Sequence, residues 1–418
     1  MQSGIGRTRP LFPRATAAVV VPRWRDRACR AIFLLPIFLL AWASEPAAAQ
    51  PVPFEQGWDV TWEDSELADP VSVTVADNEV WVADLVTGIH RWSLEGEYLG
   101  PVGRRGEGPG EYQSPVLVDA IGPGQVAVVD QQLRRVTLFG TDGEAFGTVP
   151  LPEEVRAFPD EVRAVGRLGD DLALWLVHRP RNLVRDAEDS SRLVRVSASG
   201  EIIEVVHEEP NDFHVVRRDA TNTAAVPVPF ADRPQLTFLA GSAYALGRSA
   251  GSSIRLRDAD SGEELRVLEF DATADELSGE ARIAAAESVR ESLFGELEEQ
   301  LAAGRLPESL GDYFRDKFDD MLEELEERTP ARAPLSDGMF GAGTEALWLM
   351  RPSLEAGERT REWRLLTASG SSEGCGLVAT HAGEPVDVAG GPSFLVAAEM
   401  SEEGLPRLVR YEVPEGIC

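Results

Sequence analysis

The residues best suited to metal or acid–base chemistry are five scattered histidines. They are His90, His178, His207, His214 and His381. None of them stands from another at the spacing of a metal motif such as H-x-x-x-H. His207 and His214 form the one cluster, with three acidic residues between them. We interpret this segment as an exposed polar loop rather than a metal site.

Two aspartates are a second candidate, because paired carboxylates serve as general acids, bases and metal ligands. Asp84 and Asp130 each end a β-rich run, at the same position of two similar segments. A catalytic residue need occur only once, whereas a repeated residue usually accepts hydrogen bonds from a turn that every repeat contains. We therefore interpret both aspartates as structural.

The segments that hold these aspartates form a repeat. Residues 79–97 and 125–144 each contain an alternating apolar run, a polar break, a second alternating run and a turn with glycine. The step between the two aspartates is 46 residues. A period near 45 residues is typical of the four-stranded blade of a β-propeller.

A glycine-rich segment, Gly103–Tyr112, lies between the two units. It contains two glutamates and no Lys-Ser/Thr follows it, so it is predicted to be a crossover between blades rather than a phosphate loop. The chain here resembles the NHL-type repeat of six-bladed β-propellers, through Gly103–Pro115, Asp130, Arg135, Val136, Phe139 and Gly143. The resemblance covers residues 71–150 and implies that fold. It also admits a class of six-bladed hydrolases and lyases that hold one calcium or zinc ion in the central channel.

Further β-like runs supply strands for four more blades. They lie at 170–177, 193–206, 236–239, 242–247, 253–257, 265–270, 346–351, 362–367, 376–381 and 394–411. Val60–Trp62 is expected to complete the last blade by pairing with the C-terminal strands. The predicted fold class is all-β, a six-bladed β-propeller with an inserted α-helical hairpin, and five or seven blades remain open.

The insertion covers residues 271–328. Capping-box spacing at Thr273–Glu276 marks a helix start, and apolar residues recur at helical spacing on both sides of Gly304 and Pro307. The segment holds 18 acidic and 6 basic residues without the loop geometry of a calcium site. We expect its apolar stripes to pack on each other and on the propeller face as a lid, and the alternative is a docking arm for a partner protein.

The first 49 residues differ from the rest of the chain. Seven arginines precede the apolar run Ala31–Ala43, which is shorter than the roughly 20 residues that span a bilayer. Ala47–Ala49 then offers an A-x-A cleavage site. We predict a signal peptide at 1–49, cleaved between Ala49 and Gln50, and a mature propeller at 50–418 that resides in a periplasm or outside the cell.

Cleavage would remove seven arginines and two acids, which moves the formal net charge from −31 to −36. Such a surface repels nucleic acid and anionic lipid, so neither is an expected partner. Two cysteines would remain, Cys375 and Cys418. In an oxidising compartment they form either a disulfide or two free thiols.

The preferred hypothesis is an exported, non-enzymatic propeller that binds a protein or small ligand through loops on one face. It predicts no catalytic residue, no cofactor and no membrane span after cleavage, and it is compatible with a monomer. The alternative is a metal-dependent hydrolase or lyase with Ca²⁺ or Zn²⁺ in the central channel. A third hypothesis is an envelope scaffold whose helical hairpin docks a membrane complex.

Overall fold

A computed structural model describes most of the chain beyond residue 53. The described residues are 54–61, 66–156, 160–178, 190–218, 223–240, 243–270, 272–344, 346–354, 361–367, 375–379, 384–401 and 403–413. All of them belong to one structural unit, Ala48–Cys418. The predicted signal peptide and Gln50 lie outside the described residues. Within the described residues, no helix has both the length and the apolar character needed to cross a bilayer.

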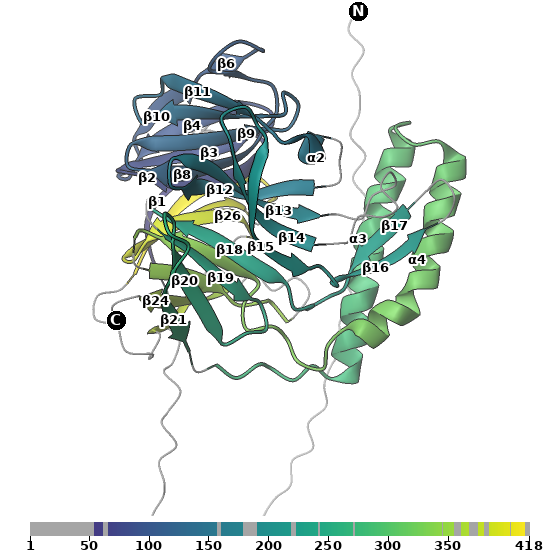
Figure 1. Cartoon of the computed structure of the whole chain (residues 1–418). Helices are drawn as coiled ribbons and strands as arrows, with labels where there is room; N and C mark the ends of the chain where they lie inside the picture. The colour runs from purple at the N-terminus through teal and green to yellow at the C-terminus, as the bar shows by residue number, and fades with distance from the viewer. Residues whose placement is uncertain are drawn as a thin grey trace, which may run out of the picture. The chain divides into compact units, whose positions relative to one another are not determined.

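Four antiparallel sheets of four strands follow one another along the chain (Figure 1). The first contains β2 (Pro70–Ala76), β3 (Glu79–Asp84), β4 (Gly88–Ser93) and β5 (Tyr98–Val102). The second contains β8 (Pro115–Gly122), β9 (Gln125–Asp130), β10 (Arg135–Gly140) and β11 (Ala145–Pro150). A short helix, α2 (Glu153–Arg156), leads to the third, which contains β12 (Asp160–Leu168), β13 (Asp171–His178), β14 (Ser190–Val196) and β15 (Ile202–Pro210). The fourth contains β18 (Pro234–Leu239), β19 (Ala243–Arg248), β20 (Ser253–Asp258) and β21 (Glu264–Glu269).

The strands near the two ends of the described chain form one sheet of eight. One half contains β22 (Gly338–Ala342), β23 (Ala346–Met350), β24 (Arg361–Thr367) and β25 (Cys375–Ala379). The other half contains β26 (Glu384–Gly391), β27 (Phe394–Met400), β28 (Pro406–Glu412) and β1 (Glu55–Thr61). The halves join through β22 and β26, where Ala342 stands opposite Gly390. The pairing of β1 with β28 confirms the closure predicted from Val60.

The first strands of the successive sets form a closed ring. Contacts run from β2 to β8, β12, β18, β22 and β26 in turn, and from β26 back to β2. The other three strands of each set lie successively farther from this ring. This is a propeller arrangement, as the repeat predicted. Apolar side chains fill the space between neighbouring sets, where for example Trp81, Val128 and Phe139 pack together.

The glycine-rich crossover joins the first two sheets, as predicted. It contains the short strands β6 (Arg104–Arg105) and β7 (Glu111–Tyr112). The buried Tyr112 hydroxyl accepts a hydrogen bond from the Ile89 N–H at 3.3 Å. Gly88 has a φ of +109°, and a Cβ there would lie 2.2 Å from the Tyr112 hydroxyl oxygen. From the second sheet, Arg135 donates to two crossover carbonyls at 2.7 Å, which fastens the segment across both sheets.

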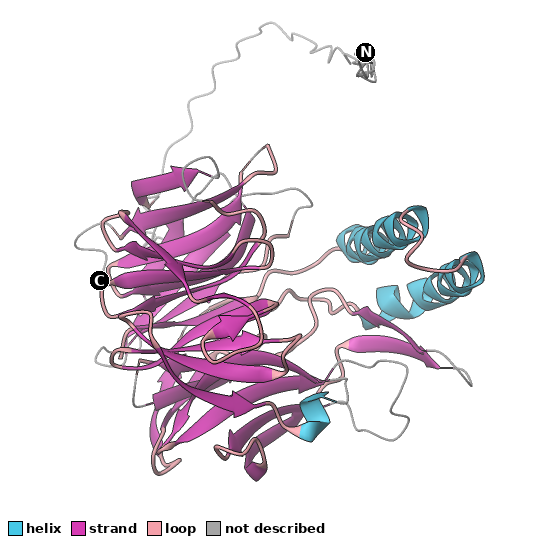
Figure 2. Ribbon diagram, turned by 90° about the horizontal axis from the view of Figure 1, so that it is seen from above, coloured by secondary structure: helices cyan, strands magenta, loops and turns pink. Residues whose placement is uncertain are grey.

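Two helices and a two-stranded ribbon form a module beside the sheets (Figure 2). The ribbon pairs β16 (His214–Arg218) with β17 (Thr223–Pro227), and the hairpin consists of α3 (Gly279–Ala302) and α4 (Glu308–Arg328). Helix α4 packs on both ribbon strands. Their shared core includes Val215, Val226, Phe318, Met321 and Leu325.

This module corrects two predictions about the insertion. Helix α3 begins at Gly279 rather than at the predicted capping box, because Ser278 Oγ accepts the Ala281 N–H at 3.1 Å while Glu276 forms a β-bridge with Arg332. The predicted lid is also wrong. The apolar stripes of the two helices pack on each other, as expected, but their other partner is the ribbon, which the sequence patterns did not predict.

Candidate functional site

A cavity of about 560 Å³ lies inside the ring of first strands. All six first strands line it, through residues such as Val75, Leu117, Val165, Thr237, Gly341 and Ala389. Loops that follow these strands line one end, at Asn78, Pro123 and Thr344. The cavity is therefore the central channel of the propeller, and each of its walls is a different part of the chain.

The first of two carboxyl groups in the channel belongs to Asp119 of β8. Its Oδ2 accepts a hydrogen bond from the Val165 N–H of β12 at 2.7 Å. Burial raises the pKa of Asp119 to about 8, although the Val165 donor opposes this, and the charge of Asp387 raises it further. The Asp119 carboxyl is therefore largely protonated at neutral pH.

The second carboxyl group belongs to Asp387 of β26. Its Oδ2 accepts the Val73 N–H of β2 at 2.8 Å, and its Oδ1 accepts the Val388 N–H at 2.9 Å. Burial raises its pKa to about 6, and the backbone donors, the Ser72 hydroxyl and the Arg163 charge oppose that rise. At neutral pH the two carboxyls together thus carry about one negative charge.

Hydroxyl groups make similar links between other first strands. Thr74 Oγ1 accepts the Ala120 N–H at 3.1 Å, and Ser72 Oγ accepts the Val118 N–H at 3.2 Å. On the other side of the ring, Thr237 Oγ1 accepts the backbone N–H of Gly341 at 3.1 Å. These polar side chains therefore hold neighbouring blades together, by accepting backbone hydrogen bonds between adjacent first strands.

The remaining lining is largely apolar and includes three half-buried aromatic rings, those of Phe238, Phe340 and Phe394. The charged lining residues are Asp77, Asp119, Asp387 and Arg163. Arg163 is itself 3.3 Å from the Glu161 carboxylate, measured from Nη2 to Oε2. The channel is therefore an apolar cavity with a net negative character.

A metal centre does not fit the channel well. In the described part of the chain, no three His, Cys, Asp or Glu residues are placed to hold a metal ion. Zinc sites in proteins use three or four protein ligands, and calcium takes six to eight oxygens. Two carboxyls, one of them protonated at neutral pH, suit a hydrogen-bond donor or an organic cation better.

The repeated aspartates have the structural role that was predicted. Asp84 accepts four backbone N–H groups at 2.7–2.8 Å, two from the loop before β2 and two from the turn after β3. Asp130 accepts four at the equivalent positions, at 2.6–3.2 Å. Burial raises the pKa of Asp84, but the four donors outweigh it and the pKa is lowered. Both carboxylates hold loops and neither lines the channel.

The described histidines also lie away from the channel. The buried His90 ring places its nitrogens 2.9 Å from the Tyr98 hydroxyl and 3.0 Å from the Thr87 hydroxyl. His214 begins β16, and its ring packs on Phe213 with centroids 4.6 Å apart. His178 ends β13 without a described side chain, and His381 lies outside the described residues.

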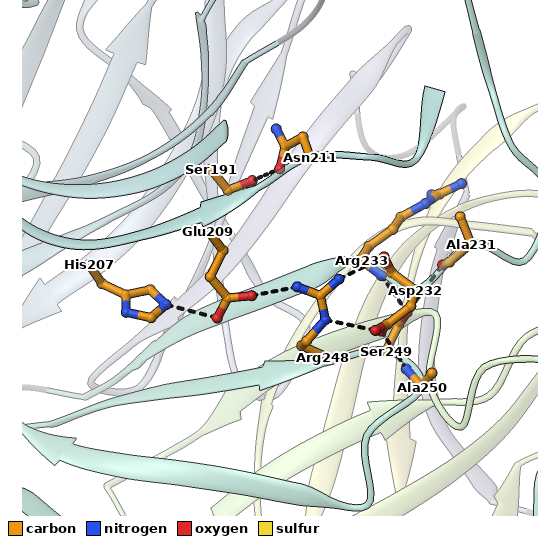
Figure 3. A network of polar contacts seen from close by, with 10 residues as sticks. All are labelled: Ser191, His207, Glu209, Asn211, Ala231, Asp232, Arg233, Arg248, Ser249 and Ala250. Carbon is orange, nitrogen blue, oxygen red and sulfur yellow. Dashed lines mark hydrogen bonds and ion pairs between the residues drawn. The ribbon is translucent and has the colours of Figure 1, made fainter. Parts of the chain in front are cut away.

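The predicted polar loop around His207 is wrong. Residues 207–210 continue β15, an edge strand whose consecutive polar residues at this end resemble a loop in sequence. His207 Nε2 lies 2.8 Å from Glu209 Oε1, and Arg248 bridges Glu209 and Asp232 at 2.6 and 2.7 Å (Figure 3). The His207 hydrogen bond lowers the pKa of Glu209, and Arg248 adds to this. The network joins the third and fourth sheets.

Two further sequence features cannot be placed. Cys375 begins β25 without a described side chain and Cys418 lies outside the described residues, so their disulfide stays a prediction. Gly370–Gly374 has G-x-S-x-G spacing and also lies outside the described residues. The strands on either side of it, β24 and β25, pair antiparallel, whereas a nucleophile elbow links a strand to a helix.

Sequence reasoning missed both channel aspartates. One signal was available for Asp119, because it interrupts the apolar residues of VLVDAI shortly after the glycine-rich segment. No such signal existed for Asp387, since the strand that carries it was not predicted. The two residues come together only through the closure of the ring.

No family model matches the sequence, and no curated protein matches it in sequence. One similar solved structure is a protein of Bacteroides fragilis described as an exported protein. The two chains are 12% identical, the alignment covers 87% of this chain and 94% of that chain, and the TM-score is 0.44. A second is the β-propeller domain of Cps50 (Swd1) from Myceliophteria thermophila, at 12% identity, 87% and 100% coverage and a TM-score of 0.39. A third is virginiamycin B lyase from Staphylococcus aureus, at 10% identity, 85% and 99% coverage and a TM-score of 0.38. These values are too low to carry an argument, so the propeller arrangement rests on the strand pairing above.

Proposed function

We propose that this protein is an exported, six-bladed β-propeller that binds a small ligand in its central channel and releases it unchanged. The observation that carries the proposal is the cavity of about 560 Å³, which combines apolar walls with a few polar groups. Ligand sites for small organic molecules have volumes of about 300–1,000 Å³ and this mixture of lining residues.

The count of six blades is supported by the ring of first strands. Six strands close the ring, and each begins a set of four antiparallel strands if the two halves of the eight-stranded sheet are counted separately. The NHL-type resemblance is supported by Asp84, Asp130 and Arg135, which hold the loops and the crossover between the first two blades.

Export is proposed from the leader at 1–49. The mature chain would begin at Gln50, only a few residues before β1 starts at Glu55 and closes the propeller. Mass spectrometry of the protein recovered from the exporting cell tests this, because cleavage predicts an N-terminal peptide that begins at Gln50. A non-reduced digest of the same sample tests the Cys375–Cys418 disulfide, and an uncleaved leader would contradict export by this route.

The channel can be blocked with one substitution. Gly122 lines the channel at the end of β8, and a Cβ at this position meets nothing within 4 Å. Gly122→Trp should therefore fill the channel without displacing its neighbours. Gly295 on the exposed side of α3 has equally open surroundings, so Gly295→Trp is a matched control outside the channel.

A thermal-shift screen of small metabolites, with Ca²⁺ and Zn²⁺ included, tests the function. Ligands should stabilise the wild type and Gly295→Trp but not Gly122→Trp, and mass spectrometry should recover them unchanged. Equal stabilisation of Gly122→Trp would place binding elsewhere and overturn the proposal. A ligand converted only in the presence of Ca²⁺ or Zn²⁺ would support the metal-dependent hydrolase or lyase instead.

A further inference from the structure

Two carboxyl groups occupy positions in the ring where the fold elsewhere uses neutral hydroxyls. Asp119 stands opposite the third residue of the following strand, as Thr74 and Thr237 do in their own sheets. Asp387 stands opposite the fifth residue, as Ser72 does. At all five positions the side chain accepts a backbone N–H from the next first strand.

The link between strands therefore does not require a charge. A threonine or serine hydroxyl makes it at the same register without the desolvation cost that a carboxylate carries in an apolar surrounding. At Asp119 and Asp387 the chain instead places two carboxyl groups in a channel open to small molecules, and together they carry about one negative charge at neutral pH. Hydroxyls would not supply that charge, and its complement is a positively charged ligand.

The rest of the channel decides what kind of cation fits. Arg163 is the one basic side chain among the described lining residues, and it is also close to the Glu161 carboxylate. The walls are apolar and carry three phenylalanine rings, whose faces attract an organic cation but offer no ligand to a bare metal ion. A cavity of about 560 Å³ also far exceeds the size of one ion.

We propose that the channel ligand is an organic ammonium compound, whose ammonium group donates hydrogen bonds to Asp119 and Asp387 while its apolar part packs on the three phenylalanines. This inference rests on the proposed function of the channel as a small-ligand site. The inference adds the chemical class of the ligand. A cation is chosen because the strand links in the ring do not require the negative charge of the carboxyl pair.

The protonation of Asp119 makes ligand affinity depend on pH, and this dependence is a second test of the proposal. Ser72 and Arg163 interact with Asp387, Thr74 and Asp77 line the same channel, and the Arg163 guanidinium also contacts Glu161. With a pKa of about 8, Asp119 holds a proton at pH 7 that a bound ammonium would displace. Affinity should therefore rise between about pH 6 and pH 8 as the pair becomes doubly ionised, with release of a proton on binding at pH 7.

Three matched probes test the proposal by calorimetry: 2-phenylethylamine, its neutral analogue 2-phenylethanol and its anionic analogue phenylacetate. The amine should bind at least tenfold more tightly than the alcohol, and phenylacetate should bind most weakly. Asp119→Asn and Asp387→Asn keep an oxygen acceptor for the strand link, and each should weaken amine binding about 10- to 100-fold while leaving alcohol binding within twofold. Asp260→Asn, in the exposed turn between β20 and β21 and outside the channel, is the control and should change amine binding less than threefold.

The outcomes separate this inference from the proposed function. If all three probes bind equally and Gly122→Trp abolishes their binding, the channel is a ligand site and the ammonium class is wrong. If amine binding persists in both Asn variants, the inference is overturned in the same way. If Gly122→Trp leaves probe binding unchanged, the proposed function itself fails. Amine selectivity that is lost in the Asn variants, with proton release at pH 7, would establish the inference.

Discussion

Asp119→Asn should make the protein more stable at high pH and change little at low pH. In the unfolded chain this carboxyl titrates near 3.8, and in the folded chain burial raises its pKa to about 8. Between these values the folded chain binds a proton that the unfolded chain has released. The stability of the wild type therefore falls as pH rises from about 4 to about 8, and the asparagine variant lacks this loss.

The size of this stability change follows from the pKa values of Asp119 in the unfolded and the folded chain. One pKa unit corresponds to about 1.4 kcal/mol, so the interval between 3.8 and about 8 sets an upper bound of about 6 kcal/mol. Asp119 is half-buried and faces a cavity that admits water, which screens its charge. We expect the variant to gain about 3 kcal/mol relative to the wild type between pH 4.5 and pH 9.

Urea denaturation of the wild type and the variant at four pH values across this range measures the gain. Asp119→Thr copies the hydroxyl link of Thr74 and Thr237, and it should show the same pH trend. Asp77→Asn, at the mouth of the channel, should run parallel to the wild type. A difference between the wild type and Asp119→Asn that stays constant from pH 4.5 to pH 9 would refute the reasoning, because it would mean that the carboxyl is solvated as in the unfolded chain.

Three other predictions concern the scaffold. Gly88→Ala and Gly100→Ala both place a Cβ at a φ of +109°, which should lower the free energy of unfolding by about 1 kcal/mol in each variant. Only the Cβ at position 88 also meets the Tyr112 ring. Urea denaturation should therefore show a further loss of about 1–3 kcal/mol for Gly88→Ala but not for Gly100→Ala. Asp130→Ala leaves four backbone N–H groups without their acceptor and should cost about 2–4 kcal/mol by urea denaturation, whereas Asp130→Asn, which retains one oxygen, should cost less. Met321→Ala should lower the stability of the helical module by about 2–5 kcal/mol, because Met321 is fully buried in its core. Hydrogen exchange should then show lost amide protection in α3, α4 and the ribbon, and unchanged protection in the blades.

Local patterns in the sequence predicted the parts of the fold that local physics decides. Alternation of apolar and polar residues indicated the strands of the first two blades, and the repetition of Asp84 and Asp130 indicated a loop-holding role that the hydrogen bonds confirm. The helical hairpin was predicted from apolar spacing, although α3 begins later than its first capping signal. The ribbon at 214–227 escaped prediction because its two strands of five residues are stabilised by packing on α4 rather than by their own pattern.

The sequence by itself determined the class of the protein: an acidic chain with a leader-like start, a repeat with a blade-length period and a helical insertion. Only the tertiary structure decided where a ligand would bind. Asp119 and Asp387 belong to strands from distant parts of the chain, and closure of the ring places both in one low-dielectric channel. In the sequence, Asp119 is marked only by its apolar neighbours, which do not indicate a partner for it. The raised pKa values of the two aspartates and their shared site arise because burial and mutual charge depend on distance in space rather than on separation along the chain.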